Sequence, residues 1–157
     1  MHQRLLAAIV FLSLVVGACS PETRPTTETK APAAAATSTA DMEAAIAHHV
    51  KTVKAADVDG VLADYAADAI LVSPPGLVTP TGTFVGKDKV REFFVWLATP
   101  AVLPAAQSMV TTNEAVGPNT MLFRWTQFPG TPKEVKGYDI FVFRDGKIIF
   151  QTTAANP

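Results

Sequence analysis

The stretch YDIFVFRDGKIIF, residues 138–150, decides the fold of this 157-residue chain. Its two apolar runs flank the pair Asp145-Gly146. This pair favours a type I′ turn, because both turn positions require a positive φ. The stretch therefore predicts a β-hairpin of two apolar strands near the end of the chain.

Asp139 is a lone carboxylate within this hairpin. Alternation along the first strand places it on one face with Phe141 and Phe143, and the opposite face is also apolar. An ionised carboxylate in such surroundings is costly unless it is paired, hydrogen-bonded or protonated. Asp139 is therefore a candidate functional residue. The alternative is a structural carboxylate that is satisfied by the backbone or by Arg124.

The chain before the hairpin shows helical patterns first and strand patterns later. Apolar side chains recur at helical spacing in residues 41–56, 57–66 and 86–97. Strands are predicted over residues 69–73, 102–116, 120–128, 134–144 and 147–153. Helices followed by hairpin-connected strands predict an α+β fold, with a curved, mostly antiparallel sheet packed against three N-terminal helices.

The first 40 residues indicate export and a tether. Residues 5–16 form an apolar run after Arg4 that is too short to span a bilayer but typical of a signal peptide. The run ends in VGAC, residues 16–19, which resembles a bacterial lipobox and contains the only cysteine. We expect a lipoprotein signal peptide over residues 1–18, a lipidated Cys19 with a disordered tether to residue 40, and a domain over residues 41–157.

A lipidated Cys19 would anchor the chain in the bacterial cell envelope, facing the periplasm. Ser20 rather than Asp after the cysteine favours the outer membrane over the inner one. An ordinary secretory signal with a chance cysteine is the alternative.

Composition and motifs give no support to several function classes. The net charge is −1 and basic residues do not cluster, so no nucleic-acid partner is expected. The sequence has no glycine-rich phosphate loop and no metal-ligand spacing, so no cofactor or metal is expected. The adjacent His48 and His49 would point about 100° apart on a helix, a poor geometry for one metal.

Four strings carry a resemblance to a known family. They are ADVDG (56–60), DYAADA (64–69), GKDKVREFF (86–94) and FVFRDGKI (141–148). In order and spacing they resemble the SnoaL-like and ketosteroid-isomerase-like branch of the nuclear-transport-factor-2-like superfamily. The resemblance implies a cone-shaped fold, in which the curved sheet wraps against the helices around an apolar pocket. Members include isomerases, dehydratases, epoxide hydrolases and polyketide cyclases, so the fold does not settle the chemistry.

The ketosteroid isomerase pattern assigns roles to three positions. In those enzymes a tyrosine and a protonated aspartate bind the oxyanion, and a second aspartate moves the proton. The resemblance places His49 at the tyrosine, Asp139 at the late-strand aspartate and Ser73 at the base. Serine is not a general base at neutral pH, so this mechanism is not expected to be complete.

His49 and Asp139 are therefore the candidates for catalysis or ligand contact. His49 could instead be a core residue, or could share a proton with Asp139. The rest of the pocket is expected to include Tyr65, Ser73, Trp96, Phe123, Trp125 and Phe141.

Three alternative functions follow from the expected pocket and from the predicted strand that contains Asp139. The first is binding of a small, mostly apolar ligand, with His49 and Asp139 as polar contacts. The second is an isomerase, cyclase or hydratase that acts on a carbonyl compound by proton transfer, so enzymatic activity stays open. The third is a homodimeric interaction module built on the opposite strand face, an apolar strip of Tyr138, Ile140 and Val142.

Overall fold

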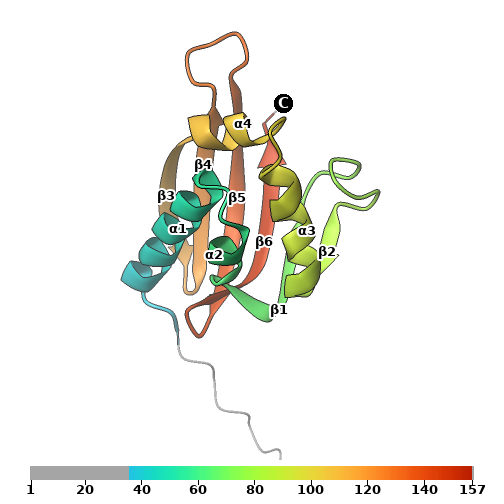
Figure 1. The fold of residues 1–157 in the computed structure, drawn as a ribbon. Coiled ribbons are helices and arrows are strands. Elements are labelled where there is room, and N and C mark those ends of the chain that lie inside the picture. Colours follow the sequence, from blue (N-terminus) through green and yellow to red (C-terminus); the bar gives the residue numbers. More distant parts are fainter. Residues whose placement is uncertain (1–35, 157) are drawn as a thin grey trace, which may run out of the picture. The chain divides into compact units, whose positions relative to one another are not determined.

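This computed structural model describes residues 36–156, which form helices and strands joined by loops (Figure 1). The helices are α1 (Thr39–Lys54), α2 (Val58–Leu62), α3 (Lys87–Leu97) and α4 (Leu103–Ser108). The strands are β1 (Tyr65–Val72), β2 (Thr83–Val85), β3 (Val110–Gly117), β4 (Thr120–Gln127), β5 (Val135–Arg144) and β6 (Lys147–Ala155). The predicted signal peptide, Cys19 and most of the predicted tether lie outside the described residues.

The strands form one curved sheet in the order β2-β1-β6-β5-β4-β3. All neighbouring strands are antiparallel except β1 and β6, which are parallel. The hairpin that decides the fold joins β5 to β6, and Asp145 and Gly146 have φ values of 53° and 72°, as a type I′ turn requires. The predicted α+β class with a mostly antiparallel sheet is confirmed.

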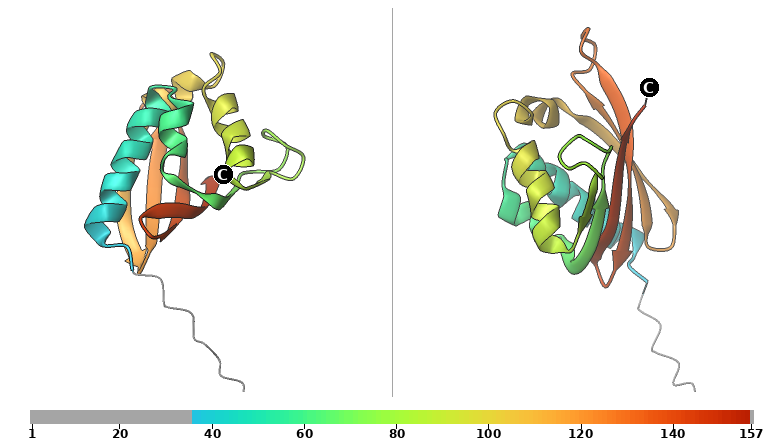
Figure 2. Two further views of the ribbon diagram at one scale, coloured as in Figure 1. Left: turned by 60° about the horizontal axis from the view of Figure 1, so that its bottom comes forward. Right: turned by 90° about the vertical axis from the view of Figure 1, so that its right-hand side faces the viewer.

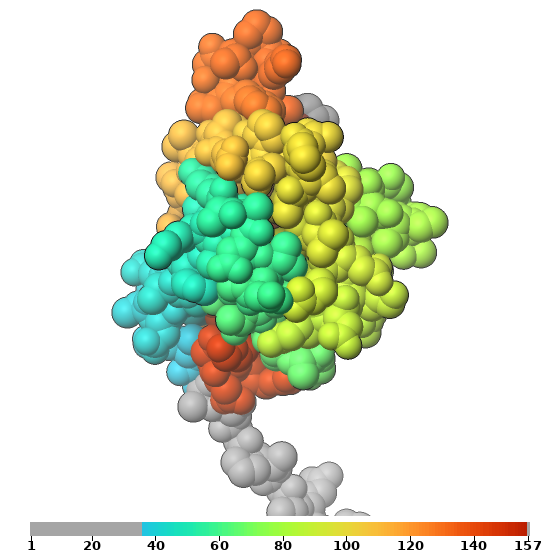
Figure 3. All heavy atoms as spheres, in the orientation of Figure 1, coloured from blue at the N-terminus to red at the C-terminus, as the bar shows by residue number. Residues whose placement is uncertain are grey.

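The helices lie on one side of the curved sheet (Figure 2). The apolar side chains of α1 and α3 meet the inner faces of the strands and form one core, with Met42, Ile46, Val90, Phe94, Met121 and Phe141 among its buried members. Figure 3 shows the helical face of the domain, beyond which the β4–β5 connection projects. No helix among residues 36–156 is long and apolar enough to cross a membrane.

Two predicted elements differ from the structure. The second helix ends at Leu62, and Tyr65 already belongs to β1 rather than to the helix. The range 102–116 was predicted as one strand, but its first half is helix α4. Pro104 lies in the first turn of α4, where a missing N–H is tolerated, and Ala105 and Ala106 favour helix. This helix covers one end of the sheet and helps to enclose the site described next.

Candidate ligand-binding site

A cavity of about 280 Å³ lies between the inner face of the sheet and helices α1, α3 and α4. Its wall is mainly apolar, with contributions from Val50, Val53, Leu77, Phe93, Phe94, Trp96, Leu97, Ala106, Met109, Phe123, Trp125 and Val135. The polar residues that line it are His49, Gln127, Asp139, Gln151 and Thr153. An apolar cavity with a few polar groups is the usual form of a small-molecule site.

Asp139 is one of the polar groups in this wall and is only 6% exposed. The indole Nε1 of Trp125 donates a hydrogen bond of 2.8 Å to its Oδ1 atom. The amide Nε2 of Gln151 donates a hydrogen bond of 2.7 Å to its Oδ2 atom. Both carboxylate oxygens therefore act as acceptors. Arg124, considered above as a partner, instead donates to Glu114 at 3.2 Å.

A buried tyrosine extends this network away from the cavity. The hydroxyl of Tyr65 on β1 donates to Oε1 of Gln151 on β6. This bond fixes the orientation of the Gln151 amide, so that its NH₂ group faces Asp139. Trp125, Asp139, Gln151 and Tyr65 thus form a chain of hydrogen bonds across four strands of the sheet.

The pKa of Asp139 is raised from 3.8 to about 6, because burial penalises the charged form. Hydrogen bonds from Trp125, Thr153 and Gln151 act in the opposite direction and favour the carboxylate. At pH 7 the group is therefore mainly ionised. The protonated aspartate of the ketosteroid isomerase pattern stays a prediction for Asp139.

His49 lines the same cavity and is 5% exposed. Its ring packs against Tyr65, Phe94 and Phe141 at centroid distances of 5.9, 5.6 and 5.3 Å. The Nδ1 atom is buried and has no hydrogen-bond partner among the described residues. Burial, and the neighbouring His48, lower the pKa of His49 to about 3, so the ring is neutral at pH 7. No hydrogen bond joins His49 to Asp139.

These two buried polar groups lie in the kind of pocket that the family resemblance implies, and comparison with known proteins identifies the family. The sequence model of the SnoaL-like domain matches residues 46–151. The chain belongs to the SnoaL-like family. Among curated proteins, no sequence is significantly similar to it.

Solved structures with the same fold are distant in sequence. A protein of unknown function with a cystatin-like fold from Methylobium petroleophilum PM1 is 19% identical, with a TM-score of 0.59 over 78% of this chain and 80% of that chain. A SnoaL-like protein of unknown function from Burkholderia thailandensis is 17% identical, with a TM-score of 0.58 over 77% and 99%. TerC, co-crystallised with polyporic acid, is 18% identical, with a TM-score of 0.55 over 74% and 91%. At these identities the likeness shows the fold alone.

Half of the predicted pocket residues line the cavity of this SnoaL-like domain. Trp96, Phe123 and Trp125 belong to its wall. Tyr65 and Phe141 do not; Tyr65 donates to Gln151, and Phe141 packs against the His49 ring. Ser73 is also buried outside the wall, and its hydroxyl lies 3.4 Å from the carbonyl oxygen of Gly82. The position that the isomerase pattern gives to the base therefore presents no group to the cavity.

Gln151 and Thr153 are site residues that the sequence reasoning missed. Both follow the apolar run of the second hairpin strand, and Thr153 pairs directly with Asp139 across the sheet. Extending the alternation from Asp139 across the hairpin would have placed both on the inner face.

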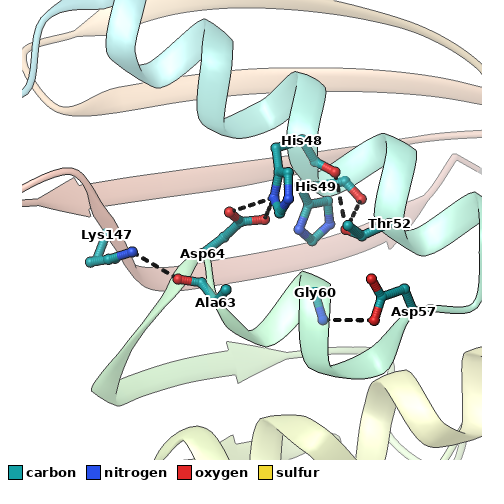
Figure 4. Close-up of polar contacts among 8 residues, drawn as sticks. All are labelled: His48, His49, Thr52, Asp57, Gly60, Ala63, Asp64 and Lys147. Atoms are coloured by element: carbon teal, nitrogen blue, oxygen red, sulfur yellow. Dashed lines mark hydrogen bonds and ion pairs between the residues drawn. The ribbon is translucent and has the colours of Figure 1, made fainter.

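His48 lies outside the cavity of the SnoaL-like domain. Its Nδ1 atom is 2.9 Å from Oδ1 of Asp64, and Lys147 donates to the neighbouring carbonyl oxygen of Ala63 at 2.8 Å (Figure 4). Burial raises the pKa of Asp64, while His48 opposes this shift. The described residues contain no group of three or more His, Cys, Asp or Glu side chains that could hold a metal.

The apolar strip considered for dimerisation lies on the other side of β5. Tyr138 is 37% exposed, whereas Ile140 and Val142 are half-buried.

Proposed function

We propose that this SnoaL-like domain binds a small, mostly apolar organic molecule in the cavity between its helices and its sheet. The observation that carries the proposal is that His49 and Asp139, both buried, line one mainly apolar cavity. The co-crystallisation of TerC with polyporic acid supports a small organic ligand for a domain of this fold.

A cavity-filling substitution tests this proposal. Ala106 is fully buried in the cavity wall, and Ala106→Leu would occupy part of the space. The matched control is Ala44→Leu on the exposed side of α1. The full chain is screened by thermal shift against a panel of small organic molecules, and solvent extracts of the purified protein are analysed by mass spectrometry. A ligand that stabilises the wild type and Ala44→Leu but not Ala106→Leu supports the proposal. A ligand that stabilises all three proteins equally contradicts it.

A second candidate is an isomerase, cyclase or hydratase that acts on a carbonyl compound. The observation that favours it is Asp139, because a carboxylate with a pKa of about 6 is well matched to proton transfer near neutral pH. His49 is less suited to that role, since its pKa of about 3 makes it a weak base. Asp139→Asn should abolish turnover of a candidate substrate while the protein stays folded and still binds it. Unchanged turnover in this variant would exclude Asp139 as the base.

We also propose that Cys19 carries a lipid and anchors the domain in the bacterial cell envelope, with the outer membrane favoured by Ser20. The support is the resemblance of residues 16–19 to a lipobox. Metabolic labelling with a fatty acid should mark the wild-type chain and not Cys19→Ala. Fractionation should move that variant from membranes to the soluble fraction.

A further inference from the structure

Among the described residues, the cavity wall holds an acidic side chain but no lysine or arginine. That side chain is Asp139, the one carboxylate in the wall among residues 36–156. His49 cannot supply the missing positive charge at neutral pH, because its own burial keeps the ring neutral. The ionised form of Asp139 therefore lacks a cationic partner within the cavity.

The contacts of Asp139 leave it able to accept more hydrogen bonds. Trp125 and Gln151 donate to different oxygens, Thr153 is a third side chain that favours the carboxylate, and an ionised carboxylate has about four acceptor positions. All three side chains are electrically neutral, so they satisfy hydrogen bonding without cancelling the charge. A cation that entered the cavity could pair with the carboxylate and still find free lone pairs.

The aromatic wall also suits a cation with an apolar body. Trp96, Trp125 and Phe123 line the cavity, and Phe93 and Phe94 line its helical side. Aromatic ring faces attract cations within about 6 Å, and the attraction is larger where water is excluded. The same rings bury the apolar part of a ligand.

Resting on the proposed function, we infer that the ligand is an apolar amine, whose ammonium group pairs with Asp139 while its hydrocarbon or aromatic body fills the cavity. An organic acid would bring a second negative charge beside Asp139, and the wall offers no basic side chain to bind it.

Three probes with one apolar body test this inference. They are 3-phenylpropylamine, 3-phenylpropan-1-ol and 3-phenylpropanoic acid, titrated into the full chain at pH 7.5 and followed by NMR. The chain is produced as Cys19→Ala so that no lipid is attached. We expect the amine to bind at least about tenfold more tightly than the alcohol, since hydrogen bonds to charged groups are stronger than neutral ones. We expect the acid to bind most weakly.

Two variants test whether Asp139 causes the preference for the amine over the alcohol. Asp139→Asn should bind amine and alcohol about equally, whereas Asp68→Asn, an exposed aspartate paired with Arg144, should keep the preference. If the alcohol or the acid binds the wild type as tightly as the amine, the inference fails and ligand binding as such survives. If none of the three binds, this inference fails, and the cavity-filling experiment decides the proposed function separately. The wild-type comparison stands even if Asp139→Asn does not fold.

Discussion

The Nε2 atom of Gln151 lies 2.7 Å from Oδ2 of Asp139, deep in the inner face of the sheet. Because Oε1 of the same amide accepts from Tyr65, the amide cannot rotate without losing both contacts. The carboxylate is thereby held as an acceptor facing the cavity. Gln151 thus links a core tyrosine to the carboxylate of the site.

Replacing Gln151 by leucine should lower stability and raise the pKa of Asp139 further. The substitution removes a donor to the carboxylate and leaves the Tyr65 hydroxyl unpaired, which typically costs about 1–3 kcal/mol for each buried polar group. Urea unfolding measures the loss, and NMR titration of the Asp139 carboxyl carbon measures its pKa. Gln127→Leu is the control, because Gln127 lines the same cavity but makes no hydrogen bond to Asp139. An equal pKa in the two variants would refute the positioning role of Gln151.

Asp139→Asn should change how stability depends on pH between about pH 4 and pH 6. The folded-state pKa is about 6 and the ordinary value is 3.8. The folded state therefore binds the proton more tightly, so the stability contributed by this group is fully present below pH 3.8 and is lost as the pH rises through 6. Between pH 4.5 and pH 7, the free energy of unfolding of the wild type should fall by about 2 kcal/mol relative to that of the variant.

Denaturant unfolding at both pH values checks this difference. The other titratable groups near Asp139 are His49, which lines the same cavity, and Tyr65, which donates to Gln151. Neither takes up a proton in the folded state between pH 4.5 and pH 7, because the pKa of His49 is about 3 and that of Tyr65 is raised well above 10. A parallel pH dependence in the wild type and the variant would contradict the raised pKa of Asp139.

His49→Leu should have the opposite effect on pH dependence. The pKa of His49 falls from 6.5 to about 3 on folding, so the unfolded state binds the proton more tightly. Stability from this group is present above pH 6.5 and is lost as the pH falls towards 3. From pH 7 to pH 4.5, the free energy of unfolding of the wild type should fall by about 2–3 kcal/mol relative to that of the variant.

The adjacent histidine provides a matched control for this experiment. His48 has an exposed ring that pairs with Asp64 and is the smaller cause of the lowered His49 pKa, so His48→Gln should leave most of the acid sensitivity in place. NMR should find the His49 ring neutral at pH 5. A charged His49 ring at that pH would rule out this explanation of acid sensitivity.

The sequence predicted the fold where local signals agree with tertiary packing. The Asp145-Gly146 turn and the flanking apolar strands identify the hairpin from short-range preferences alone. Helix α4 differs from the prediction because Val102 and Leu103 begin a stretch that reads as a strand, and packing against α1 and β4 reinforces the helical preference of the residues that follow. In short apolar segments, period alone does not separate strand from helix.

The site could be predicted only in part, for a similar reason. Helical spacing and strand alternation placed His49 and Asp139 on inward faces, and the structure has both in one cavity. The bond between Tyr65 and Gln151 joins residues 86 positions apart and depends on the parallel pairing of β1 with β6. No local pattern encodes that pairing, so the network that holds Asp139 ionised, and hence its role as an acceptor, was not foreseen.

Gly137 lies opposite Trp125 in the β4–β5 ladder. A Cβ atom at this position would lie 2.2 Å from Cζ2 of the Trp125 indole and 2.4 Å from the carbonyl oxygen of Ala154. Gly137→Ala should therefore displace the indole that donates to Asp139. We expect the steric conflict to lower the free energy of unfolding by about 1–3 kcal/mol, to change the Trp fluorescence and to weaken ligand binding.

Gly117→Ala is the matched control for this substitution. Gly117 also lies in a strand, but a Cβ atom there would meet nothing within 4 Å. Its stability and its ligand binding should stay close to those of the wild type. If the two alanine variants bind ligand equally well, the position of the Trp125 indole does not control the site. If only Gly137→Ala loses binding, and Trp125→Phe reproduces that loss, the hydrogen bond from the indole to Asp139 is required, because phenylalanine keeps an aromatic ring but has no N–H group to donate.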